Sequence, residues 1–248
     1  MEKREKLIII DGQSYIYRAF YAIRRLSNSE GMPTNAIYGF VQMMNKAIKE
    51  INPEYICIVF DSREKTFRHE IYSEYKAHRP PMPDDLSVQI PHIHEIVEAY
   101  RVRKLAIPGF EADDIIATLA KKGKKSGKEV IIITGDKDLM QLVDDEIRIF
   151  DTMKDKIYSP SDVMEKYGVM PEFMIDLLSL SGDSSDNIPG AKGIGEKTAL
   201  SLVKKFGHIH EILKRMNEIE PAKLREKIEK SEADILLSHR LLTLRDRY

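Results

Sequence analysis

Residues 6–12 read KLIIIDG, a short run of branched aliphatic residues that ends in an aspartate and a glycine. The pattern returns at 55–61 (YICIVFD) and at 129–136 (EVIIITGD), and a related run lies at 147–150. Ile and Val dominate these runs with little alternation, which is typical of strands buried on both faces of a parallel sheet. We therefore predict strands at 6–10, 55–60, 129–134 and 147–150.

Helical patterns lie between these strands, for example at 34–50 and 113–125. Strands that alternate with helices predict an α/β fold with right-handed crossover connections. After Ser161 no further strand pattern occurs, and Pro160 and Pro171 begin helical patterns. We expect a parallel-sheet core at residues 1–170 and an all-helical part at 171–248.

Composition places the chain among globular proteins. Of its 248 residues 42% are hydrophobic, and no apolar run approaches the ~18 residues of a membrane span. The amino terminus has too few apolar residues for a signal peptide, and the single Cys57 excludes both a disulfide framework and a thiolate zinc site. These features predict a soluble cytosolic protein that does not bind membranes. The formal net charge of −1 argues, at face value, against nucleic-acid binding.

Carboxylates follow the predicted strands and gather near their carboxyl ends, where open parallel sheets bind ligands. They are Asp11, Asp61, Glu111, Asp113, Asp114, Asp136, Asp138, Asp183 and Asp186. Any one of them is equally compatible with a turn or a helix cap. As a group they would repel one another strongly unless a cation lay among them. Oxygen ligands without Cys or an HExxH motif favour Mg²⁺ or Mn²⁺, and their number suggests a two-metal site for phosphodiester cleavage.

A glycine-rich segment, IPGAKGIGEKTA at 188–199, differs from a P-loop because Glu196 stands where the P-loop lysine is required. Three glycines before a helix predict a tight turn whose backbone N–H groups bind phosphate without reading bases. Nearby lysines at 192, 197, 204 and 205 support this interpretation. The alternative is an ordinary turn between two helices.

Residues 62–98 form an insertion that is broken by several prolines. Its cations Arg63, Lys65, Arg68, Lys76 and Arg79 alternate with Phe67, Tyr72 and Tyr75. Cations beside aromatic rings are typical of a channel for single-stranded nucleic acid. A solvated charged helix is the alternative.

Four motifs make the chain resemble the 5′-nuclease domain of bacterial DNA polymerase I, of the flap-endonuclease and 5′→3′ exonuclease family. They lie at 60–86 (FDSREKTFRHEIYSEYKAHRPPMPDDL), 108–120 (PGFEADDIIATLA), 134–143 (TGDKDLMQLV) and 181–199 (SGDSSDNIPGAKGIGEKTA). The resemblance extends from Leu7 to about Leu244. It implies a PIN-like core and two bound Mg²⁺ or Mn²⁺ ions. Asp11, Asp61, Glu111, Asp113 and Asp114 match the first metal site, and the other four carboxylates match the second.

The resemblance also implies roles for the basic segments. The insertion at 62–98 matches a helical arch in which Lys76 and Arg79 face the scissile phosphate, while Arg68 and Tyr75 hold the 5′ strand. The segment 188–206 matches a helix–three-turn–helix that grips the duplex, often with a bound K⁺. Its predicted DNA-binding residues are Gly190, Lys192, Gly193, Gly195, Lys197 and Thr198.

The activity implied is hydrolysis at 5′ ends and 5′ flaps of branched or nicked DNA, including RNA primer ends, in replication and repair. Such a monomeric enzyme would work at the bacterial nucleoid, fused to a DNA polymerase or separate from one. A non-catalytic DNA-junction-binding module and an RNA-directed PIN ribonuclease are the alternatives. The net charge is compatible with DNA binding, because the nine carboxylates supply −9 of a total of −1 and leave +8 for the rest of the chain.

Overall fold

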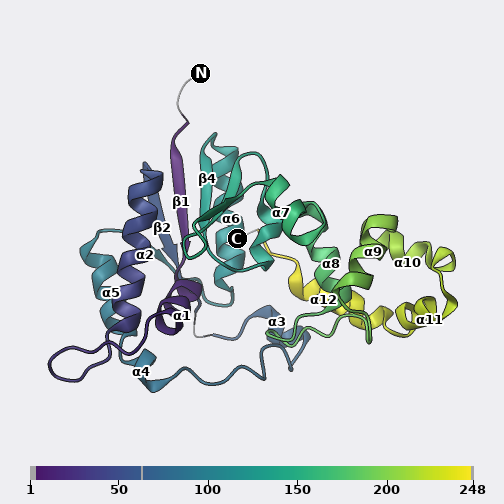
Figure 1. Cartoon of the computed structure of the whole chain (residues 1–248), viewed down its shortest axis with the longest axis horizontal. Coiled ribbons are helices and arrows are strands. Elements are labelled where there is room, and N and C mark those ends of the chain that lie inside the picture. The colour runs from purple at the N-terminus through teal and green to yellow at the C-terminus, as the bar shows by residue number, and fades with distance from the viewer. Residues whose placement is uncertain (1–3, 63, 247–248) are drawn as a thin grey trace.

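The computed structural model describes residues 4–62 and 64–246. A six-stranded sheet has the order β3-β2-β1-β4-β5-β6. Figure 1 labels three of its strands, β1, β2 and β4. The first five strands are parallel, and β6 pairs with β5 in the antiparallel direction. The strands are β1 (Lys6–Asp11), β2 (Tyr55–Val59), β3 (Arg103–Leu105), β4 (Glu129–Ile133), β5 (Ile147–Asp151) and β6 (Lys156–Tyr158).

Helices cover both faces of this sheet. On one side Ile8 and Ile10 of β1 pack against α1, α2 and α5, while Ile9 faces the cluster built on α6. This arrangement follows from the sequence, because successive strand residues point to opposite faces and all three are isoleucines. The helices of the core are α1 (Gly12–Ala22), α2 (Asn35–Ile51), α3 (Phe67–Ile71), α4 (Asp84–Ser87), α5 (Ile90–Ala99), α6 (Ala112–Lys125), the 3₁₀ turn η1 (Asp138–Leu142) and α7 (Pro160–Tyr167).

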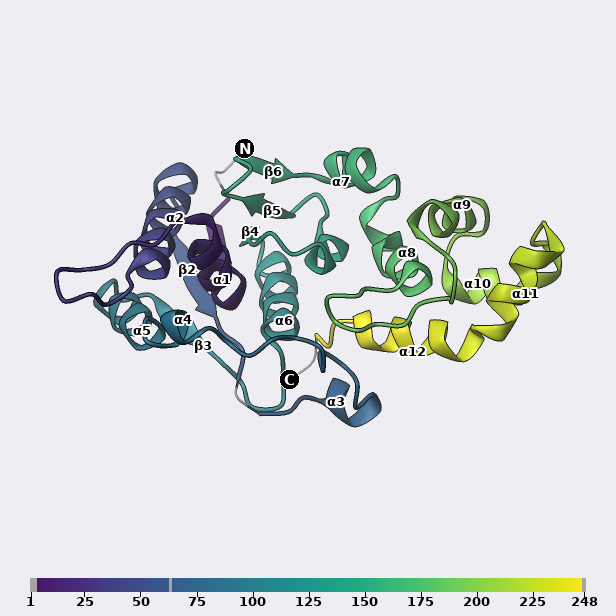
Figure 2. The same ribbon diagram turned by 60° about the horizontal axis from the view of Figure 1, so that its bottom comes forward.

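A second group of helices packs beside the core (Figures 1 and 2). The elements are η2 (Pro171–Phe173), α8 (Met174–Ser181), α9 (Glu196–Phe206), α10 (Ile209–Lys214), η3 (Met216–Glu218), α11 (Ala222–Lys230) and α12 (Glu232–Leu242). The central helix α8 packs against both α9 and α12. A loop at 182–195 joins α8 to α9 and runs back towards the carboxyl ends of the strands.

The predicted fold class is confirmed: a largely parallel sheet with helices is followed by an all-helical part. Two strands, β3 and β6, are missing from the prediction, because strands of three residues show no periodic pattern. No helix in the described part of the chain (4–62 and 64–246) is long and apolar enough to span a membrane.

Two predicted boundaries are wrong. The sequence predicts a mostly helical arch at 62–98, but the last helix of this insertion, α5, belongs to the core through the buried Ile93 and Val97. Only the short helices α3 and α4 interrupt the segment before it, and Arg63 lies outside the described residues. The predicted helix pair at 188–206 contains one helix, because its first partner, α8, already ends at Ser181.

Candidate active site

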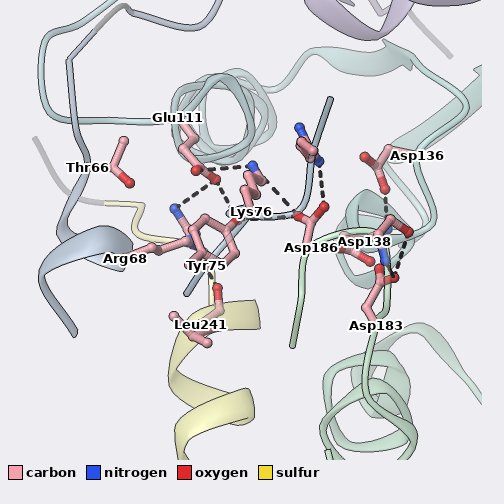
Figure 3. Close-up of polar contacts among 12 residues, drawn as sticks. Thr66, Arg68, Tyr75, Lys76, Glu111, Asp136, Asp138, Asp183, Asp186 and Leu241 are labelled. Carbon is pink, nitrogen blue, oxygen red and sulfur yellow. Dashed lines mark hydrogen bonds and ion pairs between the residues drawn. The ribbon is translucent and has the colours of Figure 1, made fainter. Parts of the chain in front are cut away.

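Acidic side chains from three strand ends, the start of α6 and the loop after α8 lie at the carboxyl edge of the sheet. Asp11 is the last residue of β1, Asp61 follows β2, and Asp136 follows β4. Glu111 is the N-cap of α6 and Asp113 lies in its first turn. The loop after α8 contributes Asp183 and Asp186. Figure 3 shows Asp183 beside Asp138 and Asp186 between Asp138 and Lys76.

Hydrogen bonds position the carboxylates at the strand ends. The Thr134 hydroxyl donates to Oδ2 of Asp11 at 2.8 Å and accepts from the N–H of Asp136 at 3.1 Å, which joins the ends of β1 and β4. Oδ1 of Asp61 accepts from the N–H of Ala112 at 2.7 Å and joins the end of β2 to the start of α6. These contacts hold acids from separate elements close together.

A second acidic group lies beside η1. The Asp138 N–H donates to Oδ1 of Asp136 at 2.9 Å. Oδ2 of Asp183 lies 3.0 Å from the Lys137 ammonium, and its Oδ1 accepts from both the N–H and the hydroxyl of Ser185. Within the described residues, the buried Oδ1 of Asp138 has no hydrogen-bond partner. An unpartnered buried carboxylate oxygen is what a cation at this position would satisfy.

Burial and mutual repulsion disfavour the charged form of several of these acids. Burial, with repulsion from Asp136 and Asp61, raises the pKa of Asp11 to about 7. Burial and repulsion from Asp136 and Asp183 raise the pKa of Asp138 to about 8, and the pKa of Asp113 is raised well above its usual value for similar reasons. Such shifts are typical of functional carboxylate clusters in which burial and mutual repulsion outweigh the effect of nearby cations.

Side-chain cations from the segment between α3 and α4 enter the acidic cluster. The Lys76 ammonium lies 3.1 Å from Glu111 and 3.7 Å from Asp186 (Figure 3). The Arg79 guanidinium lies 2.5 Å from Asp186. Lys76 has a left-handed φ of 56°, and its N–H donates to the carbonyl oxygen of Asp186 at 3.0 Å. A strained backbone held by such contacts often marks a functional residue.

The donor set suits divalent cations, because it consists of carboxylate oxygens and includes the unpartnered Oδ1 of Asp138. Among residues 4–62 and 64–246, however, no three His, Cys, Asp or Glu side chains form a group that could by themselves hold an ion. Lys76, Arg79 and Lys137 contact several of these oxygens instead. Asp11, Asp61, Glu111, Asp113, Asp136, Asp138, Asp183 and Asp186 remain the residues that could hold one or more metals once these side chains move.

Asp114 is a metal ligand in the sequence prediction, but its carboxylate is fully buried and both of its oxygens already have partners. Both of its oxygens accept hydrogen bonds from the Arg68 guanidinium, at 2.7 and 2.9 Å. Arg68 is predicted to hold the 5′ strand, yet only 2% of it is exposed, so it cannot contact DNA in this conformation. The two predictions are wrong for one reason, because each side chain neutralises the other inside the protein.

Two further predicted DNA contacts face inward. Tyr75 is 4% exposed, and its hydroxyl donates to Oε2 of Glu111 at 3.0 Å, with Asp186 3.4 Å away. Gly190 is buried and its N–H donates to the Ser238 hydroxyl at 2.9 Å, so this amide is not available to a phosphate. Its φ is +60°, and an added Cβ would lie 2.3 Å from the backbone nitrogen of Gly182. Gly190 therefore permits close packing of two backbone segments.

The remaining glycine-loop residues form an exposed basic surface at the start of α9. Lys192, Gly193, Gly195 and Lys197 are exposed, and Thr198 is half-buried. A shallow hollow of about 410 Å³ continues along α9 between Lys197, Leu200, Ser201, Lys204 and Lys205. An N-terminus with exposed amides and lysines can hold a phosphate backbone.

Sequence reasoning overlooked two residues of the site. Lys137 forms an ion pair with Asp183, and its position between two aspartates in the sequence GDKD could have identified it as a site residue. Thr134 bridges Asp11 and Asp136, but a threonine at a strand end is too common to be singled out from a sequence.

Comparison with known proteins gives consistent results along the chain. Residues 6–168 match the family described as 5′-3′ exonuclease, N-terminal resolvase-like domain, and residues 169–248 match 5′-3′ exonuclease, C-terminal SAM fold. The 5′-3′ exonuclease of Aquifex aeolicus is 44% identical over 96% of this chain and 81% of its own length. DNA polymerase I of Bacillus subtilis is also 44% identical over 98% of this chain, which spans only 28% of that protein.

Solved structures share the fold. T5 5′-exonuclease with bound zinc ions has a TM-score of 0.82 at 24% identity, covering 97% of this chain and 90% of that one. The catalytic core of Rad2 in complex with DNA substrate has a TM-score of 0.60 at 18% identity, covering 98% of this chain and 84% of that one. Family matches over residues 6–248, together with a relative of similar length, show that this chain belongs to the 5′-3′ exonuclease family.

Proposed function

We propose that this chain is a divalent-metal-dependent 5′ nuclease that hydrolyses phosphodiester bonds at 5′ ends and 5′ flaps of branched or nicked DNA. The observation that carries the proposal is the meeting of Lys76 and Arg79 with the acidic cluster at the sheet edge. Carboxylates that hold metal and cations that bind phosphate are the two components such hydrolysis needs at one place.

Two Mg²⁺ or Mn²⁺ ions would bind among the eight carboxylates of the acidic cluster. The ions would supply an activated water and stabilise the leaving oxygen. Lys76 and Arg79 would turn from Glu111 and Asp186 to the scissile phosphate and stabilise its negative charge. Thr134 would keep Asp11 and Asp136 in position during this exchange. The product would carry a 5′-phosphate.

The exposed turn before α9 would hold the duplex. Lys192, Gly193, Gly195 and Lys197 are exposed, and the two lysines suit backbone contacts that carry no sequence information. The Lys192 N–H itself donates to the Ser231 hydroxyl at 3.1 Å, so this residue would contribute its ammonium group. We also propose that a K⁺ ion binds at this turn. Such binding would place a 5′ end near the acidic cluster, and RNA primer ends would be accepted because these contacts involve phosphates.

The proposed nuclease activity involves both parts of the chain. The core (1–170) and the helical part (171–248) would act as one monomeric nuclease in primer removal and repair at the bacterial nucleoid. Similarity to both DNA polymerase I and an exonuclease of comparable length supports action beside a DNA polymerase, fused or separate.

Cleavage of labelled substrates tests the proposal. We expect cutting of a 5′ flap and a nicked duplex with Mg²⁺, no cutting with a chelator, and little cutting of single strand. Asp113→Ala and Asp186→Ala should still bind flap DNA but barely cut it, with Glu226→Ala on the exposed face of α11 as the control. Full cleavage by either aspartate variant would refute the metal assignment.

A non-catalytic junction-binding module is the second candidate. One observation favours it: in the described part of the chain, no three His, Cys, Asp or Glu side chains form a group that could hold an ion as they stand. Binding of flap DNA without cleavage under any divalent ion would establish this alternative.

A further inference from the structure

Arg68 is a rare case of a fully buried arginine, and it lies at the junction of three elements. It belongs to α3, and its guanidinium binds both oxygens of Asp114 on α6 at 2.7 and 2.9 Å. Its Nε donates to the carbonyl oxygen of Leu241, at the end of α12, at 2.7 Å. A third partner is the carbonyl oxygen of Thr243 at 3.4 Å. The planar fork of arginine, unlike the ammonium of lysine, can satisfy such partners together.

Residues 241–245, which we call the strap, leave the end of α12 and return to the core. The Arg245 N–H donates to Oδ1 of Asp114 at 2.8 Å, and its guanidinium lies 3.4 Å from the centre of the Phe67 ring. The carbonyl oxygen of Leu242 accepts from Nε2 of Gln141, which also donates to the carbonyl oxygen of Asp138. The strap thus contacts α3, α6 and η1.

These contacts lead directly to the acidic cluster. Asp114 closes the first turn of α6 by accepting from the N–H of Glu111 at 3.3 Å. Arg68 also lies 3.3 Å from Oε2 of Glu111 (Figure 3). Since Glu111 and Asp113 flank this turn, displacement of Asp114 would move two carboxylates of the site. Gln141 extends the same connection to Asp138.

We propose that Arg68 is a positioning residue: through Asp114 and the strap it orients Glu111 and Asp113 for metal binding, without contacting DNA. The inference rests on the proposed function, because it assigns Arg68 to the same metal site. Outer partners of metal ligands typically change metal affinity or activity by about 10- to 100-fold when mutated.

Arg68→Lys is the first test, since it keeps the charge and loses the fork. Mn²⁺ binding is measured by calorimetry without DNA, and kcat and KM are measured on a 5′-flap substrate. We expect Mn²⁺ affinity and kcat each to fall about 10- to 100-fold, with KM for DNA unchanged. Unchanged Mn²⁺ affinity with a raised KM would overturn the proposal and make Arg68 a DNA contact.

A matched pair on the strap keeps the test valid if Arg68→Lys does not fold. Arg245→Pro removes the N–H that donates a hydrogen bond to Asp114. Arg245→Ala keeps this N–H and removes only the side-chain contact with Phe67. We expect weaker Mn²⁺ binding for the proline variant alone. Equal Mn²⁺ affinities in the pair would contradict the role of the strap. If the wild-type chain neither binds Mn²⁺ nor cuts DNA, the proposed function itself is refuted. That result is distinguishable from failure of the Arg68 proposal, which would appear only in the variants.

Discussion

The ammonium group of Lys76 lies 3.1 Å from Oε1 of Glu111, which brings the segment before α4 onto the N-cap of α6. Burial alone would lower the pKa of Lys76, but Glu111 and Asp186 raise it above its usual value, so the side chain stays charged. The acidic cluster therefore contains its own cation in this conformation. Under the proposed function, the same cation would turn to a phosphate when the carboxylates bind metal.

Lys76→Ala should slow cleavage far more than it weakens DNA binding. Removal of one positioned electrostatic partner typically lowers the rate about 10²–10³-fold. Single-turnover cleavage of a 5′ flap and equilibrium binding measured with Ca²⁺ separate the two effects. Lys49→Ala, on the exposed side of α2, is the control and should behave as wild type. A Lys76 variant impaired only in binding would disprove a role in the chemical step.

Tyr75→Phe separates a positioning hydroxyl from a stacking ring. The hydroxyl contacts Glu111, and the buried ring has no access to a base. We expect kcat to fall about 10-fold, as for other partners of metal ligands, and DNA affinity to stay constant. Full activity of Tyr75→Phe combined with weak DNA binding by Tyr75→Ala would instead support the role in holding the 5′ strand that the resemblance implies.

The two glycines of the turn should respond differently to alanine. Gly190 has positive φ and no room for a Cβ, so Gly190→Ala should lower the free energy of unfolding by about 2–4 kcal/mol. Gly195 has no atom within 4 Å of an added Cβ, and Gly195→Ala should leave stability unchanged within about 0.5 kcal/mol. Urea denaturation measures both. Equal stabilities would mean that the close approach to Gly182 is absent in solution.

Lys197→Ala should weaken duplex binding without changing sequence preference. A lysine that contacts a phosphate releases about one counterion, so the slope of log affinity against log salt should fall by about 1. Binding to two unrelated flap sequences at several salt concentrations measures this. A sequence-dependent loss, or an unchanged slope, would show that Lys197 does not contact the backbone.

The metal-free protein should lose stability as the pH rises from about 4 to 8. Asp11 and Asp138 have folded-state pKa values of about 7 and about 8, above those of the unfolded chain, so the folded state holds more protons in this window. Stability then falls with rising pH through the window. Thermal unfolding with a chelator measures the slope, and Mn²⁺ at pH 8 should restore stability.

Asp138→Asn is the variant that isolates this effect. The asparagine side chain cannot ionise, so the free energy of unfolding of this variant should fall less between pH 4 and 8 than that of the wild type. Glu172→Gln, at the exposed middle residue of the 3₁₀ turn η2, should keep the wild-type slope. Identical slopes in wild type and Asp138→Asn would show that Asp138 ionises normally in the fold.

The sequence was sufficient to predict the parallel strands and the place of most acidic residues. Strands buried on both faces carry apolar residues at successive positions, as in the three consecutive isoleucines of β1, and this signal is local. The carboxyl ends of parallel strands meet at one edge of a sheet, so the strand pattern alone is enough to place Asp11 and Asp136 together. Short strands such as β3 carry no such signal.

Only the tertiary structure decided which charged residues face the site. Asp113 and Asp114 are neighbours in sequence, but on a helix they point in different directions, and Arg68 takes the second into the interior. Gly190 and Gly195 likewise look alike in the sequence, although one packs against a backbone and the other is open to solvent. Periodicity and residue type therefore determined the elements and their chemistry. The partners of each side chain depended on contacts between distant segments, such as α3 with the end of α12, which no local pattern encodes.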